Sequence, residues 1–364
     1  MFTSNHYVPI LKGKEGEFSA IAVTSDDTLA KMTPIIELMD FVPLKLTPEQ
    51  LRRRKKPLPT FDSHIKKEIR GVVNCWKNGN PIFIDLHLIS VNDLYSIPGG
   101  YVSLIFDELI NAGVKAIPTI YSDADSRLFA DYLKIHNRHN TGVAIRLRPV
   151  EMNSKEFLQK TQAAFGLQPK QIDLILDYES IIGQNVDTLV NNAKTFINSI
   201  LYQVEAWRTL TVASGAFPID LSDYKPLTQN DLQRNDWLFW EQLLAATLKR
   251  KPAFGDYSIA HPTIKVLERV PDVSASIRYT ADKSWKIMRG RGVNKRGWDQ
   301  IRDRCKELVG LPEYDGPGFS WGDQYIKDCA DGSDGPGAGT TWRKTANNRH
   351  FEKTCSVIAS LPGL

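Results

Sequence analysis

Pairs of charged residues occur near the ends of apolar, strand-like runs in this chain. The run IDLILDYES carries Asp177 and Glu179, and the run PIFIDLHL carries Asp85 and His87. On a β-strand, residues at i and i+2 point to the same face, so each pair is expected to share one face. Buried charges are costly unless they reach water, a cation or a metal. The pairs therefore predict a polar site to which several strands contribute.

Neighbouring runs end in charged residues of both signs. YVPILK ends in Lys12, and TPIIEL carries Glu37. GVAIRLR carries Arg146 and Arg148. The candidates for catalysis are therefore Lys12, Glu37, Asp85, His87, Asp177 and Glu179, and two further candidates for ligand binding are Arg146 and Arg148.

Three arrangements suit these residue types. In the first, the carboxylates and His87 hold a divalent cation, while Arg146 and Lys12 hold a phosphate. In the second, Arg146 and Arg148 clamp a carboxylate or phosphate without a metal. In the third, the charges satisfy one another in a structural ion network that binds no ligand. The residue types leave the cofactor open, with a divalent cation as one option.

The elements that would position these side chains follow a regular order. Eight strand-like runs alternate with helical patterns, at residues 7–12, 33–38, 81–88, 115–121, 142–148, 172–180, 209–214 and 253–259. This alternation is typical of an α/β fold with a parallel sheet, and the number eight favours a closed (β/α)8 TIM-type barrel over residues 1–260. No glycine-rich phosphate fingerprint follows the first run, which disfavours a dinucleotide-binding sheet.

Strand alternation predicts which side chains face the inside of that barrel. Inward positions include Ile10, Ile35, Phe83 and Ile175, and the charged candidates lie at the same parity towards the end of each strand. The carboxyl ends of barrel strands, with the loops that follow them, form the rim at which TIM-barrel active sites lie. The charged candidates are therefore expected to converge at the C-terminal rim.

The pattern changes after residue 260. The segment SASIRYTADKSWKIMRGRG predicts a hairpin over residues 274–291, and we expect it to cover the C-terminal rim. Residues 298–310 predict a helix that closes the barrel ring, and the last part of the chain predicts a C-terminal helical extension. Residues 261–364 are thus expected to be an excursion and extension of the same domain. A separate small domain is the alternative.

Composition restricts the class of protein. The chain has 364 residues, ordinary apolar and charged fractions and a net charge of +4, which makes a nucleic-acid partner unlikely. The basic segment LRRRKK is expected to be a solvated loop or helix end. Four scattered cysteines, no run long enough to span a membrane and no secretory leader predict a cytoplasmic protein with reduced thiols. The cysteines are Cys75, Cys305, Cys329 and Cys355.

Several segments together carry a family resemblance. They are YVPILKGKEGEFSAI with MTPIIEL, GDYSIAHP, SIRYTADKSWKIMRGRG, FSWGDQYI and TTWRKTANNRHFEKT. As a set they resemble the "beta protein" family of bacteria and their phages, although Arg349 separates Asn348 from His350 in the last segment. The resemblance implies a phage-linked or anti-phage setting and a role for Lys12, Glu37, Asp256, Tyr279, Trp285, Trp342 and His350.

Two functions fit these observations, and the residues do not decide whether the protein is an enzyme. In the first, the barrel binds or processes a phosphate-bearing small molecule, for example a nucleotide. The hairpin would then bring Tyr279, Trp285 and Arg289 over the rim, since aromatic rings and arginine suit a base and a phosphate. In the second, the protein is a non-catalytic interaction partner or sensor in phage defence or counter-defence.

Overall fold

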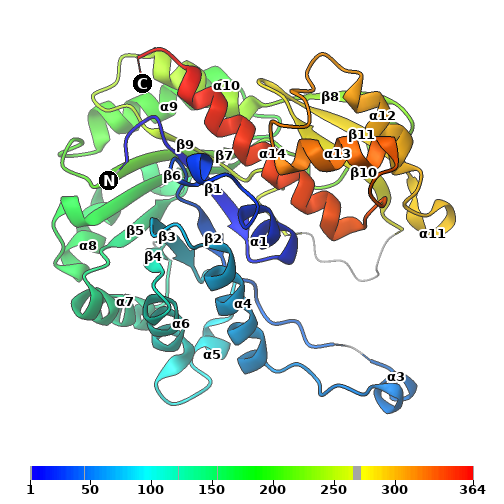
Figure 1. Cartoon of the computed structure of the whole chain (residues 1–364). Helices are drawn as coiled ribbons and strands as arrows, with labels where there is room; N and C mark the ends of the chain where they lie inside the picture. Colours follow the sequence, from blue (N-terminus) through cyan, green and yellow to red (C-terminus); the bar gives the residue numbers. More distant parts are fainter. Residues whose placement is uncertain (1, 45, 122, 154, 265–271, 364) are drawn as a thin grey trace.

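A closed parallel barrel forms most of the molecule (Figure 1). The computed structural model describes residues 2–44, 46–121, 123–153, 155–264 and 272–363. The barrel strands, in order around the ring, are β1 (Tyr7–Lys12), β2 (Ile35–Glu37), β3 (Pro81–Asp85), β4 (Lys115–Ile120), β5 (Val143–Leu147), β6 (Ile172–Ser180), β7 (Thr209–Gly215) and β9 (Ala253–Asp256). β9 pairs with both β7 and β1, which closes the ring. The eight-stranded barrel predicted from the sequence is confirmed.

The two faces of the strands are both apolar, as a barrel that is covered by helices requires. Ile10, Ile35, Phe83 and Ile175 form part of one buried cluster, which fills the barrel interior. The intervening residues, such as Ile84, belong to the larger cluster between strands and helices. The inward parity predicted for these positions is therefore confirmed.

Helices surround the barrel, and the one that completes the ring is not the one expected. α14 (Gly339–Ser360) packs against α1 and also contacts β1, so it covers the barrel where β9 meets β1 (Figure 1). The helix at the predicted closing position, α12 (Ile301–Val309), packs instead on α13 (Trp321–Asp331) and on the hairpin. The prediction for residues 298–310 was wrong because both segments are helical, and their sequences do not show which one reaches the barrel.

The other helices that follow barrel strands or lie between them range from 4 residues in α2 and α5 to 15 residues in α4. They are α1 (Glu15–Ile21), α2 (Asp26–Leu29), α4 (Phe61–Cys75), α5 (Val91–Leu94), α6 (Gly100–Asn111), α7 (Ser126–His139), α8 (Glu156–Phe165), α9 (Val186–Thr195) and α10 (Asn235–Ala245), with short turns η1 (Pro149–Asn153), η2 (Pro169–Gln171) and η3 (Phe196–Ile200). Among the described helices, none has the length and apolar character needed to cross a lipid bilayer.

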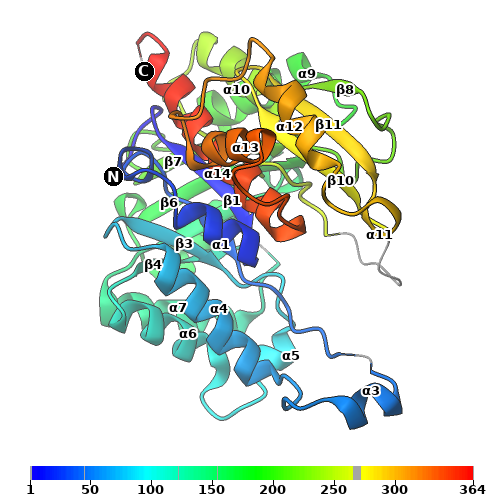
Figure 2. The same cartoon turned by 45° about the vertical axis from the view of Figure 1, so that its right-hand side comes forward.

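A second layer lies beside the barrel (Figure 2). The predicted hairpin is present as β10 (Ser274–Thr280) and β11 (Ser284–Gly292), and β8 (Gln229–Gln233) adds a third antiparallel strand. β8 was not predicted, because its residues QNDLQ are polar and lack the apolar pattern of a buried strand. Helices α11 (Val293–Arg296), α12 and α13 accompany this sheet, which has its own apolar cluster. Residues 265–271 of the predicted excursion lie outside the described residues, and the one-domain assignment stays a prediction.

An arm extends from the barrel between β2 and α4 (Figures 1 and 2). Its short helix α3 (Pro48–Arg53) begins with a capping box at Thr47. The arm exposes large apolar side chains, among them Val42, which is 78% exposed, and Leu58, which is 50% exposed. The predicted basic loop, Arg52 to Lys56, lies on this arm and is exposed, as expected.

Candidate functional site

The ends of β1, β2 and β3 place three charged side chains side by side inside the barrel. Strand register pairs Lys12 with Glu37 and Glu37 with Asp85. Lys12 Nζ forms an ion pair with Glu37 Oε2, and all three residues are buried. Because the strands pair in this register, the charged residues at the strand ends become neighbours and form one buried polar cluster at the C-terminal rim.

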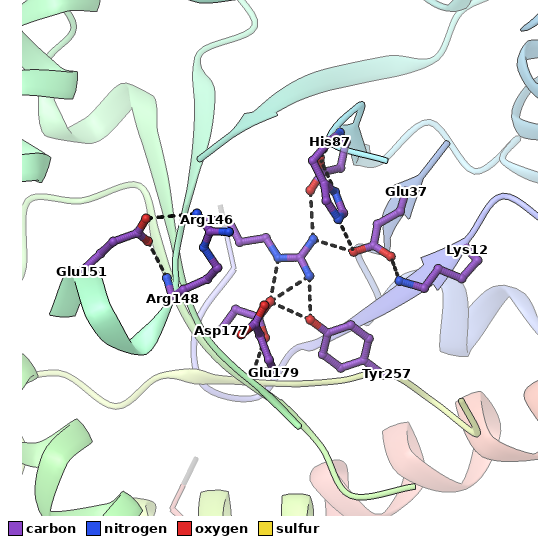
Figure 3. A network of polar contacts seen from close by, with 10 residues as sticks. Lys12, Glu37, His87, Arg146, Arg148, Glu151, Asp177, Glu179 and Tyr257 are labelled. Atoms are coloured by element: carbon purple, nitrogen blue, oxygen red, sulfur yellow. Dashed lines mark hydrogen bonds and ion pairs between the residues drawn. The ribbon is translucent and has the colours of Figure 1, made fainter. Parts of the chain in front are cut away.

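Arg146 of β5 joins these residues to β6 (Figure 3). Its Nη1 donates to Glu37 Oε1 at 2.8 Å and to Asp85 Oδ2 at 2.9 Å. Its Nε donates to Asp177 Oδ2 at 2.8 Å, and Nη2 lies 2.7 Å from the same oxygen. Each of its three nitrogens has a partner in this buried network. Arg146 therefore holds the carboxylates together and has no nitrogen left to clamp a phosphate, contrary to the expectation from the sequence.

Tyr257 is a member of the network that sequence reasoning missed. Its hydroxyl donates to Asp177 Oδ2 at 2.6 Å and lies 2.6 Å from Arg146 Nη2, as Figure 3 shows. The alternation along the last barrel strand places Gly255 and Tyr257 inward and Asp256 outward. This parity would have identified Tyr257, because the residue lies directly after the strand end.

His87 is the member of this network that solvent reaches. The sequence predicted that His87 lies on the third strand. β3 ends at Asp85, however, so His87 lies in the turn that follows. Its Nδ1 is 3.0 Å from Asp85 Oδ1, its Nε2 is 3.7 Å from Glu37 Oε1, and its side chain is 32% exposed. Burial lowers the pKa of His87, but the ion pair with Asp85 outweighs burial and raises that pKa above its ordinary value.

The surrounding charges keep the carboxylates ionised. Burial by itself would raise the pKa of Glu37, but Arg146 and Lys12 more than offset this and hold that pKa below its ordinary value. The pKa of Asp85 is also lowered, because His87 and Arg146 outweigh the effect of burial. The buried carboxylates are therefore charged at neutral pH and stabilise the protonated form of His87.

The stability of the protein should depend on the ionisation of His87. Because the folded-state pKa exceeds the unfolded value, the ion pair contributes fully below about pH 6.5 and its contribution is lost as pH rises through the folded-state pKa. The difference in unfolding free energy between the wild type and His87→Gln should therefore shrink from pH 6 to pH 9. Chemical denaturation across this range measures it. A difference that grows with pH would contradict the assigned ion pair.

Two predicted site residues lie outside the network. The Glu179 backbone has a φ of 52°, and the pairing of β6 with β7 is shifted between Asp177 and Ser180. This bulge ends the strand alternation, so the Glu179 side chain is exposed and does not share the inward face of Asp177. Arg148 follows β5 and pairs with Asp123 at 2.8 Å and Glu151 at 3.4 Å, so it forms no clamp with Arg146.

Three of these residues have the spacing of a metal site. Glu37, Asp85 and His87 each offer one ligand atom, and these atoms lie within 4.8 Å of one another. The carboxylates are already paired with Lys12 and Arg146, however, and a dication would lie beside both fixed positive charges. This arrangement favours the ion network over the metal site, because a metal would have to displace one of the two cations.

A second buried network occupies the outer side of β9. Asp256 accepts from the Tyr7 hydroxyl at 2.6 Å, and its other oxygen lies 2.8 Å from His350 Nε2. His350 Nδ1 lies 2.9 Å from the Thr280 hydroxyl of the hairpin. This network connects β1, β9, α14 and β10, and Asp256, His350 and Thr280 are fully buried. Its geometry is that of a structural connection between the barrel and the second layer.

Comparison with known proteins identifies the family of this chain. The model of the family described as Beta protein matches residues 7–356. The chain belongs to the Beta protein family. No curated protein matches the sequence. The resemblance stated from the sequence motifs is therefore confirmed.

Solved structures match this chain at low similarity. Two mutants of the tryptophan synthase α-subunit of the hyperthermophile Pyrococcus furiosus are 14% and 12% identical, cover 70% of this chain and 87% of theirs, and have TM-scores of 0.35 and 0.39. A chain of the tryptophan synthase α2β2 complex of the same organism is 12% identical. The match covers 71% of this chain and 90% of that chain, with a TM-score of 0.36. These similarities carry no information on function.

The other residues that the Beta protein resemblance implied are divided between the two layers. Trp285 is buried against Phe217, which follows β7, and against His350 of α14, whose ring contacts the last residue of β9. This part of the hairpin therefore lies at the C-terminal rim, as predicted. Tyr279 and Trp342 instead belong to the apolar cluster of the second layer, so the hairpin does not bring Tyr279 to the rim. The reason is that alternate residues of β10 and β11 face opposite layers.

Arg289 likewise has a structural position in this Beta protein. Its Nη1 donates to the backbone oxygens of Ser222 and Tyr224, at 3.1 and 2.5 Å, and its Nε donates to Ser274. These contacts hold the segment before β8 against the hairpin. Arg289 is therefore not directed to the rim network, contrary to the expectation from the sequence.

Proposed function

We propose that this protein binds a phosphate-bearing small molecule at the C-terminal rim of its barrel and that His87 transfers a proton to or from it. The observation that carries the proposal is the exposure of His87 within a charge network whose other members are buried. A positioned histidine with an orienting carboxylate is a common general acid–base group. Asp85 and Glu37 raise the pKa of His87 and so favour its protonated form, which would act as the acid.

The surroundings of His87 support an anionic ligand. The centroid of the His87 ring lies 4.9 Å from that of Tyr121, and the Arg148 guanidinium lies over the Tyr121 ring, 5.1 Å from its centroid. Arg148 Nε has no hydrogen-bond partner among the described residues, although Arg148 Nη2 is paired. A protonated histidine and an incompletely paired arginine beside one aromatic ring suit a phosphate ester that also carries a ring.

Calorimetry with the full chain tests this ligand class. Nucleoside mono-, di- and triphosphates are titrated against the protein, and the corresponding nucleosides serve as matched controls without phosphate. We expect saturable binding of at least one phosphate ester and at least tenfold weaker binding of its nucleoside. Equal affinity for an ester and its nucleoside, or binding of neither, contradicts the proposal. Mass spectrometry of small molecules released by denaturation identifies a ligand that co-purifies.

The phage-linked setting and the cytoplasm belong to this proposal. The family resemblance implies the setting, and four free, buried cysteines fit a reducing compartment. We expect phage plating on cells that carry the gene to differ from plating on cells without it, and His87→Gln to remove the difference. If the wild-type gene leaves plating unchanged over a broad phage panel, the phage-linked role is contradicted. The calorimetric test would then decide separately whether the protein binds a phosphate ester.

A non-catalytic interaction role is the second candidate, and the arm between β2 and α4 favours it. Val42, Leu44, Leu51 and Leu58 are exposed there, beside the basic run of Arg52 to Lys56. Exposed apolar residues grouped with charges are typical of protein-binding surfaces. If this role is correct, Leu51→Ser combined with Leu58→Ser should abolish the phage phenotype, while His87→Gln leaves it intact. The opposite pattern supports the small-molecule function.

A further inference from the structure

Three cations without ion pairs lie near the C-terminal ends of β1 and β9. Lys14 follows β1, Arg278 belongs to β10, and Arg343 lies near the start of α14. Lys14 and Arg343 are exposed, and Arg278 is partly exposed. Within the described ranges, none of the three forms a salt bridge, and the side-chain hydrogen bond of Arg278 goes to the backbone oxygen of Ile259 at 2.8 Å. They differ in this respect from Lys12 and Arg146, whose charges are neutralised.

The loop after β1 and helix α14 bring Lys14 and Arg343 together. A Cβ atom at Gly16 would lie 2.7 Å from Arg343 Cβ and 3.4 Å from the backbone oxygen of Thr340, so only glycine permits this close approach. Gly13 N–H donates to the backbone oxygen of Glu37 at 2.8 Å. The loop that carries Lys14 is therefore held between α14 and the end of β2.

The segment after β9 holds Arg278 near Arg343. Ser258 Oγ donates to Asn347 Oδ1 at 2.7 Å, and Asn347 Nδ2 donates to the backbone oxygen of Arg343 at 2.8 Å. The next residue, Ile259, accepts the hydrogen bond from Arg278. Arg278 also lies over the ring of Phe217, at 4.8 Å from its centroid. Residues 258–259 thus connect to both arginines: Ser258 connects through Asn347 to the backbone of Arg343, and Ile259 binds the side chain of Arg278.

We propose that Lys14, Arg278 and Arg343 form a subsite that binds the phosphate group of the ligand. This inference deepens the proposed function and rests on it for the identity of the rest of the ligand. Guanidinium groups bind phosphate through paired, charge-assisted hydrogen bonds, and lysine adds a compact positive charge. A phosphate bound there would neutralise charges that the described residues leave uncompensated.

The electrostatics of the three residues agree with an anion site. Burial lowers the pKa of Arg278, and the nearby charge of Arg343 lowers it further. Lys14 and Arg343 keep solvent-accessible side chains, but the surrounding protein partly desolvates both and lowers their pKa values, and the charges of Arg343 and Lys12 lower the pKa of Lys14 further. Burial is the largest cause of each shift, and the additional effect of Arg343 on Arg278 and on Lys14 indicates that these like charges lie close together. Arginine still remains protonated at neutral pH, so the repulsion persists until an anion binds.

Glu17 is the acidic group that faces this cluster, and it does not cancel the charge. Its Oε2 has no hydrogen-bond partner among the described residues, and burial raises its pKa to about 7 despite Lys14 and Arg343. The cluster therefore keeps a net positive charge with or without Glu17 ionised.

The subsite lies near one end of the network around His87, since the charges of Lys12 and Glu37 affect the pKa of Lys14. Lys12, two residues before Lys14, pairs with Glu37, and Glu37 Oε1 lies 3.7 Å from His87 Nε2. A ligand whose phosphate lies at Lys14 would therefore extend along the ends of β1, β2 and β3 towards His87. The two groups of residues would bind different parts of one molecule.

Calorimetry with inorganic pyrophosphate at low ionic strength tests the subsite separately from any ester. Arg343→Gln and Lys14→Gln should each weaken binding by about 10- to 100-fold, since each removes one charged contact. Lys344→Gln is the matched control, because it removes the same charge one residue further along α14, where Lys344 lies 3.6 Å from the ring of Trp321. The control should bind pyrophosphate within about twofold of the wild type.

The outcomes separate this inference from the proposed function. Unchanged pyrophosphate affinity in Arg343→Gln, or an equal loss in Lys344→Gln, overturns the subsite, even if a phosphate ester binds elsewhere on the rim. Selective loss in Arg343→Gln and Lys14→Gln supports the subsite, even if His87→Gln proves to have no effect on turnover. Tighter binding of a single-stranded oligonucleotide than of any mononucleotide would overturn the small-molecule assignment.

Discussion

Replacing Arg146 with methionine is expected to destabilise the protein by about 3–5 kcal/mol, the usual effect of removing one partner from a buried ion network. The change would leave Asp177 without its cationic partner and would leave Glu37 and Asp85 with fewer compensating charges. All of these groups are buried, so water cannot replace the lost hydrogen bonds. Methionine fills a similar volume, so the effect arises from charge and hydrogen bonding rather than from a cavity.

Thermal and urea unfolding of the purified variant measure this effect. Arg148→Met is the matched control, because Arg148 lies two residues away in the chain and its side chain is 28% exposed. Its ion pairs are partly solvated, so its loss should cost about 1 kcal/mol or less. Equal and small effects of the two substitutions would show that the carboxylates do not depend on Arg146, and would remove the basis for the buried network.

The His87→Gln variant is expected to lose about 10²- to 10⁴-fold in turnover of the ligand found by calorimetry, which is the usual contribution of a general acid–base group. The stability of the variant should change by less than about 1 kcal/mol at pH 8, because the side chain is partly solvated. Glutamine keeps a hydrogen-bonding side chain but cannot transfer a proton. The loss should therefore appear mainly in kcat and only slightly in the affinity for the ligand.

His139→Gln is the control for this experiment. His139 also pairs with an aspartate, Asp107 at 3.1 Å, but lies at the end of α7, away from the rim residues. Its replacement should leave turnover unchanged. If His87→Gln retains full turnover, or if both variants lose activity equally, His87 is not the proton-transfer group. The rim network would then be a structural ion network that binds no ligand, which is one of the three arrangements that the residue types allow.

Strand parity correctly predicted that most of these charged side chains converge, whereas their role as a functional site stays a prediction. Lys12, Glu37, Asp85 and Asp177 lie at inward positions near the ends of their strands, and the structure brings them together around Arg146. Alternation is a local property of an extended chain, so a regular strand reveals it without knowledge of its neighbours. The same rule failed at Glu179, where a positive φ and a shifted register break the alternation. The run of residue types does not reveal that bulge.

The order of the eight barrel strands and the inward face of the barrel were determined by the sequence itself, because apolar periodicity is encoded residue by residue. Only the tertiary structure decided which helix completes the ring, since α12 and α14 are both helical and the choice depends on packing against α1 and β1. It also decided that Lys14, Arg278 and Arg343 lie near one another. These residues come from three distant segments, and their proximity follows from contacts such as Gly16 with Arg343 and Ser258 with Asn347, which no local pattern specifies.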